Sequence, residues 1–296
     1  MSECFCDKVF FMIDALKKIA RKNKVVTMVY YNLKKVVVFF FLFTPLKALF
    51  VEAHPLITTR KPTTFPLRLL FNPAKISILK IVAPYTLLGY DALENVYELA
   101  KNIEKHKLEG AFVECGTWKG GAAATMAVVA HRYGDKRKTW YFDSFEGMPE
   151  PTQEDKKEKG KRGGVEDLAG DALKASVSDV EELVFKKLKL SRENNVIIKG
   201  WFQDTLPQKK KEIGSIAILR LDGDWYESTK VCLEELYDQV VLGGYVIIDD
   251  YGALAGCKQA VHEFFNKRNI KPEFRFIGTY DPEVFSISPP AYFQKS

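Results

Sequence analysis

The amino-acid sequence predicts an α/β fold, a doubly wound sheet of seven strands that is mostly parallel and closes with a C-terminal antiparallel hairpin. Two observations lead to this prediction. From about residue 84, short apolar runs alternate with longer segments of helical period, which is the pattern of strands joined by crossover helices. Several of these runs end in glycines or carboxylates, the residues that doubly wound folds place at their ligand-binding edge.

Each element follows from its own pattern. The first helix is predicted over residues 90–106, where Leu93, Val96 and Ala100 share one face. Apolar runs predict five strands, within residues 110–118, 139–149, 194–202, 215–224 and 243–252. Helical period predicts three further helices, over residues 120–134, 228–241 and 256–269. The segments "FRFIGTY" (274–280) and "VFSISP" (284–289) are expected to form the closing antiparallel strands.

The first 83 residues form a basic, aromatic-rich extension, and residues 84–296 form the main domain. Residues 1–90 contain 14 Lys and Arg against 4 Asp and Glu, a balance of +10, so the rest of a chain of net charge +6 carries −4. Pro45 and Lys47 interrupt the apolar stretch at 34–51, which is too short for the ~20 residues of a membrane span. We expect this extension to pack on the main domain or on a second subunit, and contact with an anionic membrane surface is the alternative.

Cysteine usage indicates the compartment. The chain has five cysteines, an odd number, and no C-x-x-C pair. We therefore expect a reducing, cytoplasmic location, which becomes peripheral to a membrane if the extension contacts one.

Residues 150–171 stand out because they are densely charged and nearly free of apolar residues. Such composition is typical of a solvated loop. The segment also leaves the carboxyl end of the second predicted strand, where a mobile lid over a ligand would lie. Both interpretations stay open.

The stretch "VECGTWKGG" (113–121) is a strand, a glycine-rich turn and the start of a helix. Glycines allow a ligand to approach the backbone and the helix N-terminus offers unbonded N–H groups. The dinucleotide pattern G-x-G-x-x-G and a Walker lysine are absent, and the carboxylate of Glu114 would repel a pyrophosphate. Asp143, at the tip of the next strand, is where such folds bind ribose hydroxyls. Together these residues suggest a nucleoside with a cationic tail; a tight packing turn and a turn aspartate are the plainer interpretations.

Acidic residues end two later strands. "LRLDGDW" places Asp222 and Asp224 after one apolar run, and "VIIDDYG" places Asp249 and Asp250 after the next. If these strands are neighbours, the carboxylates converge at one edge and could hold Mg²⁺ or a similar divalent cation. Such an ion can bind an acceptor hydroxyl, orient it and lower its pKa. Helix capping is the alternative role of these acids.

Five motifs in this order resemble the macrocin O-methyltransferase family over about residues 84–265: "FVECGTWKGGAA", "YFDSFEGMPEP", "KGWFQDTLP", "LRLDGDWYESTKVCLEELY" and "GGYVIIDDYGALAGCKQAVHEFF". The resemblance implies the Rossmann-like fold of class I methyltransferases and transfer of a methyl group from S-adenosylmethionine to a hydroxyl, of a sugar or glycosylated natural product. It implies a metal site at Asp222, Asp249 and Asp250, with Asp222 also the catalytic base and Asp224 a supporting acid. It implies cofactor binding by nine residues: Thr86, Glu114, Gly116, Trp118, Asp143, Ser144, Trp201, Phe202 and Asp204.

Other functions remain as alternatives. A haloacid-dehalogenase-type phosphatase would need its D-x-D on the first strand, whereas "LDGD" follows three strands. A D-x-D metal-dependent glycosyltransferase would leave "VECGTWKGG" unexplained, and a binding protein with a methyltransferase fold and no activity would not need all three aspartates. Nucleic acid is a disfavoured partner because the main domain is slightly acidic. A small-molecule hydroxyl acceptor is expected; a homo-oligomer stays open.

Overall fold

The computed structural model describes residues 73–134, 136–155, 173–278 and 290–296. The expectations for residues 1–72, for residues 156–171 of the charged segment and for a strand at 284–289 lie outside this part of the chain. The chain divides into two units, Met1–Lys80 and Ile81–Ser296, and helix α4 (Pro73–Val82) spans their boundary. Among the described residues no helix has both the length and the apolar character needed to cross a membrane.

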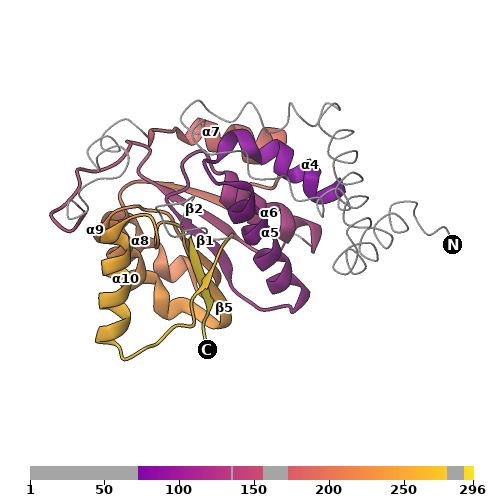
Figure 1. Cartoon of the computed structure of the whole chain (residues 1–296). Coiled ribbons are helices and arrows are strands. Elements are labelled where there is room, and N and C mark those ends of the chain that lie inside the picture. Colours follow the sequence, from indigo (N-terminus) through magenta and orange to yellow (C-terminus); the bar gives the residue numbers. More distant parts are fainter. Residues whose placement is uncertain (1–72, 135, 156–172, 279–289) are drawn as a thin grey trace, which may run out of the picture. The chain divides into compact units, whose positions relative to one another are not determined.

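The second unit is built on one seven-stranded sheet with the order β3-β2-β1-β4-β5-β7-β6 (Figure 1). Its strands are β1 (Ala111–Cys115), β2 (Thr139–Asp143), β3 (Asn195–Lys199), β4 (Ile216–Leu221), β5 (Val240–Ile248), β6 (Arg275–Phe276) and β7 (Ala291–Gln294). The first five strands are mutually parallel, and β7 runs antiparallel to both β5 and β6. This arrangement confirms the predicted fold class.

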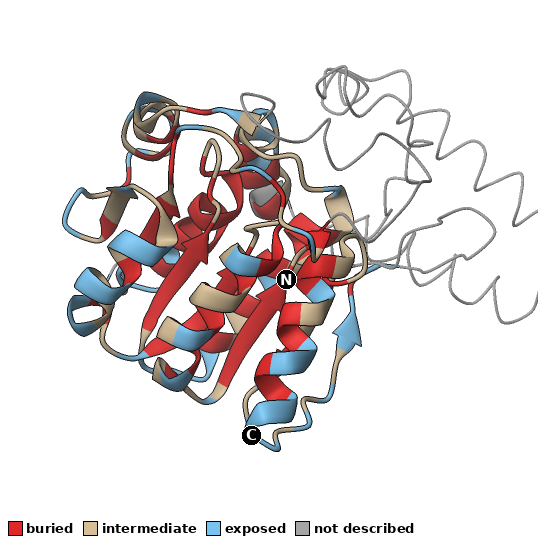
Figure 2. Cartoon of the chain, turned by 90° about the vertical axis from the view of Figure 1, so that its left-hand side faces the viewer, coloured by how far each residue is buried: buried red, intermediate tan, exposed pale blue. Residues whose placement is uncertain are grey.

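Helices cover both faces of the sheet (Figure 1). Helices α5 (Tyr90–Lys105) and α6 (Gly121–Arg132) pack together on one face, and α8 (Phe202–Ile213), α9 (Tyr226–Leu236) and α10 (Ala255–Lys267) pack side by side on the other. Shorter helical turns complete the chain: η3 (Ala83–Tyr85), α7 (Val177–Glu181), η7 (Glu182–Lys187) and η8 (Tyr237–Gln239). The central strands are buried between the two helical layers, whereas the edge strand β3 is mostly half-buried and the edge strand β6 is exposed (Figure 2).

The apolar residues of each strand explain this burial. In β1, Val113 and Cys115 face the layer of α8, α9 and α10, within a core that also contains Leu219 and Leu221 of β4. The alternate residues, among them Phe112 and Glu114, therefore face the layer of α5 and α6. Because both faces are covered, the parallel strands are almost continuously apolar, as the sequence showed.

Several elements differ from the sequence prediction, and the short helices α7 and η7 were not predicted at all. Helix α8 was missed because it is mostly polar, with Pro207 inside it and only Leu206 and Ile213 buried. The last strand is Ala291–Gln294, which follows the segment expected at 284–289. The helix predicted over 228–241 ends at Leu236, because Val240 already belongs to β5.

Candidate active site

The site begins with the register of two parallel strands. Glu114 of β1 lies opposite Arg220 of β4, and both side chains point toward the layer of α5 and α6. Arg220 is 0% exposed and Glu114 is 1% exposed. Burying a charge of either sign costs free energy unless an opposite charge pairs with it. This register therefore places two buried groups of opposite charge where each can pair with the other.

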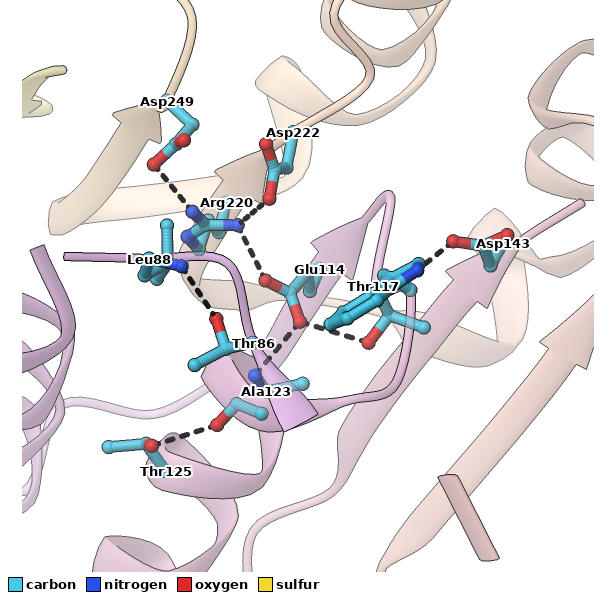
Figure 3. A network of polar contacts seen from close by, with 12 residues as sticks. Thr86, Leu88, Glu114, Thr117, Ala123, Thr125, Asp143, Arg220, Asp222 and Asp249 are labelled. Atoms are coloured by element: carbon cyan, nitrogen blue, oxygen red, sulfur yellow. Dashed lines mark hydrogen bonds and ion pairs between the residues drawn. The ribbon is translucent and has the colours of Figure 1, made fainter. Parts of the chain in front are cut away.

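Arg220 is held by three carboxylates (Figure 3). Its Nη1 donates to Glu114 Oε1 at 2.7 Å and to Asp222 Oδ2 at 2.6 Å, and its Nη2 donates to Asp249 Oδ1 at 2.6 Å. Backbone bonds align the strand ends that carry these acids: Asp222 N donates to Cys115 O, and Asp249 N donates to Leu221 O. The guanidinium therefore joins the carboxyl ends of β1, β4 and β5.

Sequence reasoning missed Arg220. It identified the acids that end β4 and β5 and expected a bound cation among them. In the structure the guanidinium of Arg220 supplies a positive charge between these acids. The available signal was an arginine inside the otherwise apolar strand "IAILRL", since a buried arginine requires carboxylates or other acceptors nearby.

Asp222, Asp249 and Asp250 come together as the sequence predicted. One ligand atom from each lies within 4.8 Å of the others, close enough to bind a single ion. Asp250 is buried, and its Oδ2 has no hydrogen-bond partner in the described part of the chain. Burial, reinforced by the charges of Asp224 and Asp222, raises the pKa of Asp250 well above its usual range. A carboxylate in this setting would gain from a cation.

Asp224 lies outside this triad, although it follows Asp222 by two residues. It adopts a left-handed backbone conformation, with φ of 60°, at the turn that leads into α9. Burial and the neighbouring charges of Asp222 and Asp249 raise its pKa well above the usual range. Asp224 thus adds a further acidic group beside the triad, and the supporting role inferred from the resemblance stays a prediction.

The donor set suits a hard divalent cation. Glu114, Asp222 and Asp249 contact the one guanidinium, and Asp224 and Asp250 lie close enough to interact with it electrostatically, so the acids outnumber the single arginine. Arg220 bonds one oxygen of Asp222 and one of Asp249, and an oxygen of each of these residues lies within 4.8 Å of an oxygen of Asp250. Oxygen ligands from carboxylates are those that Mg²⁺ prefers. Together with the unpartnered oxygen of Asp250, this arrangement fits a divalent ion.

The glycine turn after β1 brings the first motif against this edge. Gly116 has φ of 90°, and a Cβ atom built there would lie 1.7 Å from the carbonyl oxygen of Asp222. Only glycine permits so close an approach of the two backbones. Glu114 Oε2 accepts hydrogen bonds from Thr117 Oγ1 at 3.0 Å and from Ala123 N in α6 at 2.8 Å. Burial raises the pKa of Glu114 to about 7, and the charge of Arg220 acts in the opposite direction.

These contacts give Glu114 an internal role. Its carboxylate binds Arg220, the turn and the N-terminal part of α6, so it organises the edge of the sheet from within (Figure 3). The segment before α5 adds to the same edge. A Cβ atom on Gly121 would lie 2.7 Å from Cβ of Thr86, whose Oγ1 accepts a hydrogen bond from Leu88 N. Thr86, Glu114 and Gly116 are therefore neighbours of one helix N-terminus, and their cofactor contacts stay predictions.

Asp143 ends β2 beside the same turn. Its Oδ2 accepts a hydrogen bond from Trp118 N at 2.8 Å, and its Oδ1 accepts one from Phe145 N at 2.7 Å. Both donors belong to residues with positive φ, 49° at Trp118 and 54° at Phe145, so the carboxylate stabilises two left-handed turns. Burial raises the pKa of Asp143. Ser144 stabilises the following turn, because its Oγ donates to Gly147 O and accepts from Glu146 N.

The third expected cofactor segment starts α8. Trp201 precedes the helix, Phe202 begins it, and Phe202 also packs against the core and near Gly223 of the acidic turn. Asp204 is exposed in the first turn of α8. Phe202 therefore lies close to the turn that carries Asp222, whereas contact of Trp201 and Asp204 with a cofactor stays a prediction.

Comparison with known proteins shows that the chain is similar to O-methyltransferases. A family model described as Macrocin-O-methyltransferase (TylF) matches residues 81–280. Demethyldecarbamoylnovobiocin O-methyltransferase of Streptomyces niveus is 37% identical over 191 residues, which cover 64% of this chain and 71% of that protein. Mycinamicin III 3''-O-methyltransferase of Micromonospora griseorubida is 30% identical over 190 residues, covering 64% of this chain and 73% of the relative.

Solved structures show the same likeness. The structure of the O-methyltransferase NovP is similar with a TM-score of 0.59 and 34% identity, over 72% of this chain and 82% of NovP. The calicheamicin methyltransferase CalS11, at 19% identity and a TM-score of 0.57, shares the fold over 77% of this chain and 88% of its own.

Proposed function

The chain belongs to the macrocin O-methyltransferase family, which makes it an S-adenosylmethionine-dependent O-methyltransferase, and we propose that it methylates a hydroxyl of a sugar in a glycosylated natural product with the help of a divalent cation. One observation carries the metal part of this proposal. Three carboxylates from two neighbouring strands lie within 4.8 Å of one another. The sugar part rests on the relatives, one of which methylates demethyldecarbamoylnovobiocin and another mycinamicin III.

The cofactor is expected across the carboxyl ends of β1, β2 and β3. S-adenosylmethionine supplies the methyl group when it is bound. Its methionine part would bind at the turn between β1 and the N-terminus of α6, and Asp143 and Ser144 at the end of β2 would contact its ribose. Thr86, Glu114 and Trp118 line the methionine end in this proposal, and Trp201, Phe202 and Asp204 at the start of α8 lie toward the adenine.

The acceptor is expected at the carboxyl ends of β4 and β5. Asp222, Asp249 and Asp250 would hold Mg²⁺, which would lower the pKa of an acceptor hydroxyl. Asp222 takes up the proton of that hydroxyl, because Asp222 stands at the end of β4, between the glycine turn of β1 and the acids of β5. The chain's contribution is to orient the two reacting groups, which can be worth ~7–11 kcal/mol.

A metal-independent O-methyltransferase is the second candidate, and one observation favours it. Arg220 already places a positive charge against Asp222 and Asp249. In that case the acids would orient the acceptor and take up its proton without a divalent ion. The two candidates differ in a direct way, because only the first loses turnover when divalent ions are removed.

The test combines binding and turnover. S-adenosylhomocysteine is titrated calorimetrically into the wild type and into Asp249→Asn, and methyl transfer to demethyldecarbamoylnovobiocin, to mycinamicin III and to a sugar-free catechol is measured with MgCl₂ or with EDTA. We expect Asp249→Asn to bind S-adenosylhomocysteine about as tightly as the wild type and to lose turnover. Asp238→Asn, at an exposed aspartate that pairs with Arg268 just before β5, is the matched control and should keep both.

Three results would count against the proposal. Absence of S-adenosylhomocysteine binding would remove the cofactor assignment. Full turnover in EDTA would replace the metal-dependent mechanism with the metal-independent one. Methylation of the catechol in preference to both glycosides would remove the sugar acceptor.

A further inference from the structure

Arg220 directly contacts carboxylates at the ends of all three strands of the candidate site. All three of its hydrogen bonds to acids come from the two terminal nitrogens, Nη1 and Nη2, whereas its Nε has no partner among the described residues. The position of the guanidinium is therefore set by the acids at its far end. In return, Arg220 supplies these acids with a positive charge and also restricts their relative positions.

The geometry comes from the rigid fork of the guanidinium. Nη1 and Nη2 are fixed relative to each other in one plane, and here one bonds Asp222 while the other bonds Asp249, each at 2.6 Å. The fork therefore sets the separation and the rotamers of two carboxylates that belong to different strands. A lysine would keep the charge, but its single ammonium cannot impose that separation.

The third contact anchors the fork itself. Nη1 also bonds Glu114, and Glu114 is held from its other oxygen by Thr117 Oγ1 and Ala123 N. Since Glu114 and Arg220 are both buried, solvent does not compete for these bonds. The fork is thus fixed to the glycine turn and to α6 on one side and presents two oriented acids on the other.

We propose that Arg220 is a positioning residue that holds Asp222 and Asp249 in the arrangement a divalent cation needs. This inference rests on the metal site of the proposed function. Partners that orient metal-ligating residues typically contribute 10–100-fold to metal affinity. Arg220 acts through the aspartates, and it is the structural link between the metal side of the site and the glycine turn on the cofactor side.

The test compares Arg220→Lys with a change at a partly buried arginine. Arg137 bonds Glu104 through Nε and the backbone oxygens of Leu108 and Gly110 through its terminal nitrogens, at the opposite edge of the sheet. Arg137→Lys therefore makes the same chemical change in a comparable hydrogen-bond network, away from the acids of the candidate site. Mn²⁺ binding to each protein, saturated with S-adenosylhomocysteine, is measured from the electron paramagnetic resonance signal of free MnCl₂, alongside thermal stability.

We expect Arg220→Lys to bind Mn²⁺ at least about tenfold more weakly than the wild type, and raised MnCl₂ to restore part of its turnover. Arg137→Lys should bind Mn²⁺ as the wild type does even if it melts earlier. Equal Mn²⁺ affinity in Arg220→Lys and wild type overturns the role of Arg220 and leaves the proposed function intact. Absence of Mn²⁺ binding to the wild type overturns the metal site and this inference together.

A crystal structure of the wild type with MnCl₂ tests the same inference if Arg220→Lys does not fold. With Mn²⁺ at the three aspartates, Arg220 should still donate to both Asp222 and Asp249. A guanidinium displaced from either carboxylate would overturn the proposal, because the fork would then compete with the ion and not prepare its site.

Discussion

Gly116→Ala is the change for which the structure gives the clearest expectation. The added Cβ atom would lie 1.7 Å from the carbonyl oxygen of Asp222, and real Cβ atoms essentially never approach another heavy atom closer than 3.0 Å. The two backbones must therefore separate by about 1.3 Å. The atoms nearest to the added Cβ are the backbone O, C and Cα of Asp222, so no side chain can rotate away to relieve the contact.

The expected loss of stability has two parts. Alanine at φ of 90° is strained by about 1–3 kcal/mol, and forcing two packed segments apart costs about another 1–3 kcal/mol. Gly134→Ala is the matched control, because Gly134 also has positive φ, 125°, but nothing lies within 4 Å of its added Cβ. It should show the strain without the clash.

The assays are urea unfolding and turnover. Gly116→Ala should be less stable than Gly134→Ala by about 1–3 kcal/mol, the clash alone. It should also lose turnover by about 100-fold or more, because Asp222 moves by about 1 Å in a site that depends on alignment. If the free energies of unfolding of the two variants agree within about 0.5 kcal/mol, the close approach of Gly116 to Asp222 does not constrain the site.

Two further predictions concern the cofactor side of the site and the first residues of the charged segment. Burial raises the pKa of Asp143, so its carboxylate takes up a proton at a higher pH than a free aspartate does. The affinity for S-adenosylhomocysteine, measured by calorimetry, should therefore fall as the pH is lowered from about 8 toward 4. Asp143→Asn should bind S-adenosylhomocysteine more weakly, and its affinity should depend less on pH. A wild-type affinity that is constant over this range would contradict the role of the ionised carboxylate. Asp155→Ala should unfold about 1–2 kcal/mol more easily, because Asp155 Oδ1 accepts a hydrogen bond from Tyr226 N at the start of α9 and its Oδ2 accepts two from Thr152. Asp155→Asn keeps one acceptor and should lose less, and a melting temperature of Asp155→Ala equal to that of the wild type would exclude this capping role.

The sequence was sufficient for the sheet and for the acidic triad because both follow from simple patterns. Apolar runs that alternate with helical segments predict a doubly wound sheet, and neighbouring parallel strands bring their carboxyl ends to one edge. Asp222, Asp249 and Asp250 could therefore be grouped from the sequence, and in the structure they lie close together. Their metal role stays a prediction.

Other features depend on long-range contacts that no local pattern contains. The position of Arg220 depends on the register between β1 and β4, which also determines that Glu114 faces inward. The bond from Trp118 N to Asp143 depends on a left-handed residue that is not glycine, a conformation that sequence seldom indicates. Strand β7 has only four residues, too few for a clear alternation.

The pair formed by Glu114 and Arg220 also has a consequence for how the chain reaches its fold. The two residues are 106 positions apart, and they meet only when β1 and β4 pair in one register. A slip of one residue would turn Arg220 toward the apolar layer of α8, α9 and α10 and leave Glu114 buried without its partner. Breaking a buried pair in this way typically costs about 3–5 kcal/mol. The charges that prepare the site thus also favour the correctly paired sheet over sheets with a shifted register, so variants that remove either charge should accumulate as misassembled protein, whereas Arg220→Lys keeps the charge that pairs with Glu114.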